Sequence, residues 1–146
     1  MKILTSLLLF IARVSIAAIF ITAGISKLMN YDDTAKYMVA NGFTMVPLFL
    51  FGAAAIELIG GVFLIIGFKI RWAAFVLLAF LIPTTLIFHA FWTQEGAARA
   101  INEIMFFKNL AIFGGLIYVI CFGGGKFSCN GCKPQTSPDQ QNRPPA

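Results

Sequence analysis

The sequence predicts an all-α membrane protein, a four-transmembrane-helix bundle with both termini in the cytoplasm. Of its 146 residues, 59% are hydrophobic and 12% are charged, whereas soluble domains carry roughly 45–50% apolar and about 25% charged residues. The apolar residues form four long stretches, and most basic residues lie near the ends of those stretches. A chain of this length makes one compact domain. We therefore expect a membrane domain over residues 1–125 and a disordered cytoplasmic tail over residues 126–146.

Each apolar stretch is long enough to cross a bilayer, which takes about 20 predominantly apolar residues. The stretches cover residues 3–25, 46–66, 72–92 and 104–122. Trp72 and Trp92 bracket the third stretch, and tryptophan is enriched at both membrane interfaces. Arg13 interrupts the first stretch, whereas the apolar core of a cleaved signal peptide is uninterrupted. We therefore expect the first stretch to remain as a membrane helix.

The connections between the stretches predict the orientation. A tight turn, residues 67–71, joins the second and third stretches, whereas residues 32–45 and 93–103 leave room for short interfacial helices. On the side of the tight turn lie Lys2, Lys69, Arg71, Lys126, Lys133 and Arg143, and on the other side lie Lys27, Lys36, Arg99 and Lys108. Cytoplasmic loops carry an excess of Lys and Arg, and short loops follow this rule best. The tight turn and both termini are therefore predicted to be cytoplasmic.

Two opposite charges are expected near the centre of the membrane. With a helical rise of 1.5 Å per residue, Arg13 lies about 15 Å from the start of the first stretch and Glu57 about 16 Å from the start of the second. Both depths fall near the middle of a hydrocarbon core about 30 Å thick. A lone charge there costs at least about 2.5 kcal/mol. We therefore predict an intramembrane ion pair between Arg13 and Glu57, which either tunes a site or only clasps two helices.

A second polar group is predicted near the outer face. Lys27 ends the first stretch, His89 comes one turn before the end of the third, and Lys108 and Asn109 open the fourth. Three potential cations and an amide at one depth would form an electropositive ligand-binding pocket. In the alternative interpretation, the lysines extend to the lipid headgroups and the histidine bonds a backbone carbonyl.

The tail contains one motif, Cys129-Asn130-Gly131-Cys132. This C-x-x-C spacing suits a pair of redox thiols or half of a metal site. Two cysteines do not complete the four ligands of zinc, so we predict no metal. The reducing cytosol favours a plain thiol pair at this position. Nucleic-acid binding is not expected either, because no basic stretch interleaves with aromatic residues.

The chain resembles the DoxX family of small bacterial four-helix membrane proteins. The matching segments occur in family order over about residues 10–120. They are residues 13–20, Ala23-Gly24-Ile25-Ser26-Lys27, Glu57-Leu58-Ile59-Gly60-Gly61, Gly67, Arg71-Trp72-Ala73-Ala74, Phe88-His89, Lys108-Asn109-Leu110-Ala111 and Gly114-Gly115. The C-x-x-C motif is not part of this resemblance.

The resemblance implies a multi-pass protein of the bacterial inner membrane, a quinone- or thiol-linked subunit associated with a membrane oxidoreductase. On this interpretation, Lys27, His89, Lys108 and Asn109 would hold a quinone or a small anion, and a soluble or membrane redox partner would be expected. Two alternatives involve no redox step in the bundle. One is a transport or scaffold protein, and the other is a membrane anchor whose tail binds a soluble partner.

Overall fold

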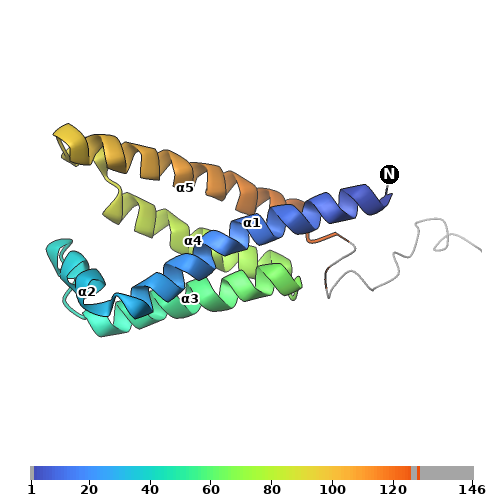
Figure 1. Cartoon of the computed structure of the whole chain (residues 1–146), viewed down its shortest axis with the longest axis horizontal. Coiled ribbons are helices and arrows are strands. Elements are labelled where there is room, and N and C mark those ends of the chain that lie inside the picture. Colours follow the sequence, from blue (N-terminus) through green and yellow to red (C-terminus); the bar gives the residue numbers. More distant parts are fainter. Residues whose placement is uncertain (1, 126–127, 129–146) are drawn as a thin grey trace, which may run out of the picture.

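The computed structural model describes residues 2–125 and 128, which form helices joined by short connections (Figure 1). In chain order these are α1 (Lys2–Met29), α2 (Tyr31–Ala40), α3 (Val46–Ile66), α4 (Ile70–Phe88), the 3₁₀ helix η1 (Phe91–Thr93) and α5 (Gly96–Phe122). Within this described part, four segments are long and apolar enough to cross a membrane, namely Ile3–Met29, Val46–Ile66, Ile70–Thr93 and Gly96–Phe122. The predicted all-α, four-helix membrane fold is confirmed. The predicted tail, apart from Ser128, lies outside the described residues.

The two longer connections form different structures. The connection between α1 and α3 contains a short helix, α2, as expected from the length of this connection. The second contains only η1, because from Gly96 onward the chain continues as α5, a helix of 27 residues. The segment Ala97-Ala98-Arg99-Ala100 consists of strong helix formers, so nothing interrupts the helix between the connection and the fourth apolar stretch.

Close packing of α1 against α3 forms the main helix pair, and the two helices run antiparallel (Figure 1). A Cβ atom at Gly24 would lie 2.8 Å from Leu58 Cγ, and one at Gly61 would lie 2.7 Å from Ile21 Cγ1. Only glycine fits at these positions, as is common where membrane helices approach closely. α4 packs against α3 on one side and α5 on the other, so the helices follow the order α1, α3, α4, α5.

The bundle has two ends, which we call the turn end and the α2 end. The turn end contains the α3–α4 turn, the beginning of α1 and the end of α5. The α2 end contains α2, η1 and the beginning of α5. There, the Tyr37 hydroxyl donates to the Phe88 carbonyl at 3.2 Å, and the rings of these two residues stack. These contacts fix α2 against the end of α4.

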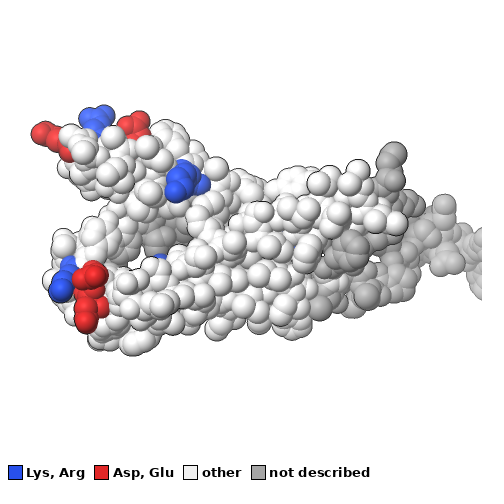
Figure 2. Space-filling model, viewed as in Figure 1, with Lys and Arg blue, Asp and Glu red and all other residues white. Residues whose placement is uncertain are grey.

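α5 approaches α1 only toward the turn end. A Cβ atom at Gly115 would lie 3.0 Å from Ile16 Cδ1, and one at Gly125 would lie 2.9 Å from Leu9 Cδ1. Toward the α2 end, α5 diverges from α1 and α3 (Figure 1). The space-filling view shows a hollow between them, with acidic and basic side chains near its rim (Figure 2). The four-helix bundle is therefore closed at one end and splayed at the other.

Candidate functional site

A buried ion pair joins α1 to α3. Both carboxylate oxygens of Glu57 lie 2.8 Å from Lys27 Nζ. Glu57 is buried at 5% exposure, whereas the Lys27 side chain retains 27%. The lysine comes from the last turn of α1 and reaches back along α3. One cation therefore satisfies a carboxylate that would otherwise be alone in an apolar interior.

The predicted ion pair between Arg13 and Glu57 is wrong, because Glu57 binds Lys27 instead. The Arg13 side chain is 2% exposed, and its Nη1 donates to the Gly124 carbonyl at 3.1 Å. It also lies at the level of Gly67, where an added Cβ would be 2.7 Å from Nη1. Gly124 follows the carboxyl end of α5, where helix carbonyls make the environment negative. The arginine thus bonds a backbone carbonyl at the turn end.

The error arose from the offset between α1 and α3. The predicted depths assumed that each helix enters the membrane at the first residue of its apolar stretch. α1 is 28 residues long and α3 is 21, and Gly67, directly after the end of α3, lies against Arg13 in the middle of α1. The beginning of α1 therefore extends beyond the end of α3, and Arg13 lies opposite the α3–α4 turn.

His89 belongs to a polar chain at the α2 end. Its Nδ1 lies 3.0 Å from Asn102 Oδ1, and Asn102 Nδ2 donates to Gln94 Oε1 at 2.7 Å. These bonds connect the end of α4, the segment after η1 and α5. Asn102 and Gln94 were not among the site residues predicted from the sequence. Asn102 precedes Asn109 by seven residues on one helix, a spacing that returns to the same face, and this signal could have identified it.

Asn109 and Thr85 form the polar part of a cavity between α4 and α5. Asn109 Nδ2 donates to Thr85 Oγ1 at 2.9 Å. The cavity measures about 160 Å³, and its lining includes Leu81, Thr85, Phe106, Asn109, Leu110 and Phe113. Thr85 is buried, so the amide and the hydroxyl form a polar spot within an apolar wall.

The structure divides the four predicted pocket residues among separate contacts. Lys27 binds Glu57, His89 contacts Asn102, and Asn109 lines the α4–α5 cavity. Lys108 is exposed and lies 3.7 Å from Met105 Sδ on its own helix. Cys129 and Cys132 lie outside the described residues.

Comparison with known proteins places the chain in a family. The DoxX family model matches residues 8–90, which contain Lys27, Glu57 and His89. The chain belongs to the DoxX family. It is 33% identical to the inner membrane protein YphA of Escherichia coli (strain K12) over 121 residues, which are 83% of this chain and 86% of that protein. It is 34% identical to the inner membrane protein YqjF of the same organism over 130 residues, 88% of this chain and 93% of that protein.

This DoxX-family chain is a multi-pass inner-membrane protein, as the two relatives and the four membrane-spanning helices show. The SURF4 family model also matches, over residues 54–135. One relative of that kind is the Surfeit locus protein 4 homolog of Schizosaccharomyces pombe (strain 972 / ATCC 24843), 39% identical over 66 residues, 44% of this chain and 22% of that protein. No solved structure matches the chain. The α5 residues of the α4–α5 cavity lie beyond the DoxX match and within the SURF4 match.

Proposed function

We propose that this inner-membrane protein is a small redox-associated subunit that binds a quinone in the cavity between α4 and α5. The observation that supports this proposal is the Asn109–Thr85 pair, 2.9 Å apart, in a wall of leucine, isoleucine and phenylalanine side chains. A quinone ring is flat and uncharged, and its two carbonyl oxygens accept hydrogen bonds. Sites for such molecules are mostly apolar, with a few convergent polar groups.

The donors in the cavity suit a carbonyl better than an anion. Thr85 Oγ1 accepts from Asn109, so the hydroxyl hydrogen of Thr85 can turn toward a ligand, and Asn109 keeps a second amide hydrogen. Both groups are neutral. The lysines predicted for an anion site are placed elsewhere, since Lys27 is paired with Glu57 and Lys108 is exposed. A quinone is therefore favoured over a small anion.

The size and position of the cavity fit the ring of a quinone while its tail stays in lipid. At about 160 Å³, the cavity is smaller than the roughly 300–1,000 Å³ of sites that enclose a drug-sized ligand. Ile82, Leu86 and Leu110 line it and are also exposed, so its mouth opens toward the bilayer. A ring could enter sideways from the membrane. The quinone would carry the electrons, residues of this chain would orient the ring, and a redox partner would exchange electrons with it.

Quenching of Trp92 fluorescence tests this proposal. The chain has two tryptophans, and the Trp92 ring lies 5.8 Å from the ring of Phe106, which lines the cavity. In a Trp72→Phe background, a short-chain ubiquinone analogue should quench Trp92 saturably in detergent. Loss of one hydrogen bond, worth about 0.5–1.5 kcal/mol, should weaken binding roughly two- to tenfold in Thr85→Val and in Asn109→Leu.

Thr84→Val is the matched control. The Thr84 hydroxyl bonds the Phe80 carbonyl of its own helix at 2.9 Å, so the same substitution one residue away should leave quinone binding unchanged. Linear, non-saturating quenching in the parent protein, or equal weakening by Thr84→Val and Thr85→Val, would rule out this site. Organic extraction of the purified parent protein should also release quinone.

A further inference from the structure

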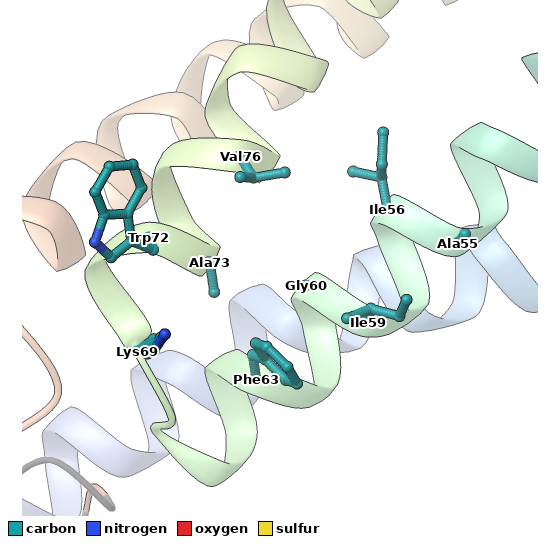
Figure 3. A pocket seen from close by; sticks show the side chains of 9 residues that line it. All are labelled: Ala55, Ile56, Ile59, Gly60, Phe63, Lys69, Trp72, Ala73 and Val76. Atoms are coloured by element: carbon teal, nitrogen blue, oxygen red, sulfur yellow. The ribbon is translucent and has the colours of Figure 1, made fainter.

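A second cavity lies on the other side of α4, between α4 and α3 (Figure 3). It measures about 300 Å³, and Ile59, Gly60 and Phe63 from α3 face Trp72 and Val76 from α4 across it. The lining on α3 runs from Ala55 to Phe63, about 12 Å along the helix axis. The cavity is therefore an elongated groove rather than a compact pocket, and we call it the α3–α4 groove.

The α3–α4 groove is apolar along its length and opens to the bilayer. Gly60 packs closely against Leu77 of α4, where an added Cβ would lie 2.7 Å from Leu77 Cγ, and the larger side chains of Ile59, Phe63 and Val76 border the groove beside this contact (Figure 3). Trp72 is 69% exposed and Ile59 is 56% exposed, so the groove faces lipid in a membrane-spanning helix pair. An elongated apolar groove with this exposure suits a hydrocarbon chain.

A single cation lies at the turn end of the groove. Lys69 is part of the lining, and its side chain extends beside Ala73 (Figure 3). Within residues 2–125 and 128, ion pairs form at Lys27–Glu57 and Lys36–Asp33, and no carboxylate pairs with Lys69. The neighbouring Arg71 is directed elsewhere, toward the Cys121 carbonyl on α5 at 3.4 Å. The Lys69 ammonium lies over the Phe68 ring, 5.9 Å from its centre, a contact that leaves its N–H donors available to a ligand in the groove.

The backbone holds Lys69 in an unusual conformation. Its φ of 41° makes it the one non-glycine residue with positive φ in the described part of the chain. Side-chain-bearing residues rarely adopt this region, and residues held there often belong to functional sites. This conformation places Lys69 in the α3–α4 turn, directly before the first residue of α4.

We propose that the α3–α4 groove binds an anionic phospholipid, with an acyl chain along the groove and the phosphate at Lys69. The Trp72 indole N–H, at the same end, would be a further donor to the headgroup. The acidic residues of the described chain, Asp32, Asp33, Glu57, Glu95 and Glu103, belong to α2, to the Lys27 pair or to the beginning of α5. The turn end therefore complements a negative headgroup. A free phosphate would leave the apolar length of the groove unused.

Trp72 supplies a direct test. A Trp92→Phe protein has Trp72 as its only tryptophan and is reconstituted in phosphatidylcholine vesicles. Trp72 quenching by dibrominated phosphatidylglycerol is then compared with quenching by dibrominated phosphatidylcholine. We expect about a fivefold preference for the anionic lipid, the effect of one basic residue near an anionic headgroup. Lys69→Gln should abolish the preference and Lys69→Arg should keep it.

Lys2→Gln is the matched control, since residue 2 begins α1 at the turn end and the substitution removes the same formal charge. It should leave the preference of Trp72 for phosphatidylglycerol unchanged. In the complementary Trp72→Phe protein, Trp92 should show no such preference. Equal quenching by both lipids, or equal effects of Lys2→Gln and Lys69→Gln, would overturn the proposal. So would displacement of brominated phosphatidylglycerol from Trp72 by a short-chain quinone, which would make the groove a quinone site.

Discussion

Glu57 on α3 and Lys27 on α1 form a buried ion pair in which one ammonium contacts both carboxylate oxygens at 2.8 Å. The two partners are not equivalent. Glu57 is buried, whereas Lys27 lies in the last turn of its helix and keeps part of its side chain exposed. A long lysine side chain can extend to an interface when its partner is removed, but a carboxylate on the middle of α3 cannot.

Removing the lysine should therefore cost more stability than removing the charge of the glutamate. Lys27→Met leaves an unpaired buried carboxylate and should lower the free energy of unfolding by about 3–5 kcal/mol. Glu57→Gln leaves a lysine that can extend to water, and should cost about 1 kcal/mol. Thermal unfolding in detergent would compare the two. The double variant Lys27→Met/Glu57→Leu should recover much of the loss, and equal losses in the single variants would contradict this account.

Arg13 should be energetically independent of Glu57. The Arg13 guanidinium bonds the Gly124 carbonyl at the turn end, whereas Glu57 bonds Lys27. In a double-mutant cycle, Arg13→Met and Glu57→Gln should add within about 0.5 kcal/mol, as expected for distant sites without shared partners. The cycle of Lys27→Met with Glu57→Gln is the positive control and should show coupling. Strong coupling of Arg13 to Glu57 would show that the two meet in the membrane.

The membrane fold could be predicted from sequence because each spanning helix can be recognised by its length and apolar composition. The partners of the buried charges could not be predicted from sequence, because pairing depends on how far two helices are displaced along each other. That displacement is set by close packing, in which Gly24 meets Leu58 and Gly61 meets Ile21. A depth counted along a single helix contains no information about it. Arg13, expected near the centre of the membrane beside Glu57, is buried at the turn end beside Gly67 and Gly124.

The candidate site was partly predictable for a different reason. Asn109 was singled out by its depth, and it does line a cavity. Lys108, its neighbour, was assigned to the same pocket, although successive residues on a helix point about 100° apart. The structure places Lys108 on the exposed surface. Thr85 could not be recognised from α4 alone, since its role depends on the contact with Asn109 on α5.

Two glycines should respond in opposite directions to the same substitution. Gly67 has a φ of +76°, and an added Cβ would lie 2.5 Å from Ser128 Cβ and 2.7 Å from Arg13 Nη1. Gly67→Ala should therefore lower stability by about 1–3 kcal/mol. Gly52, inside α3, has nothing within 4 Å of an added Cβ, so Gly52→Ala should raise stability by about 0.5–1 kcal/mol. Thermal unfolding of the two variants measures both changes in stability. A Gly67→Ala protein as stable as the parent would contradict the expected clash of the added Cβ with Ser128 and Arg13.

The predicted orientation can be tested with reporter fusions. At the turn end, the α3–α4 turn carries Lys69 and Arg71, whereas the acidic residues near Asp33 and Glu95 lie at the α2 end. Because basic loops stay in the cytoplasm, a fluorescent reporter fused after Arg71 should be active in the cytoplasm. Alkaline phosphatase fused after Asp33 or Gly96 should be active outside it. Phosphatase activity from the Arg71 fusion would reverse the topology.

Lys69→Gly should separate the stability of the fold from binding in the α3–α4 groove. Lys69 has a φ of 41°, a conformation that costs a side-chain-bearing residue about 1–2 kcal/mol and glycine almost nothing. The glycine variant should therefore unfold at a higher temperature than the parent while losing the preference of Trp72 for phosphatidylglycerol. Lys36→Gly is the contrasting control. Lys36 lies inside α2 with a fully helical backbone, so glycine there should lower stability by about 1 kcal/mol and leave the lipid preference intact. If Lys69→Gly instead destabilises the protein, the lysine contributes to the fold itself, and its positive φ is compensated by contacts of the side chain.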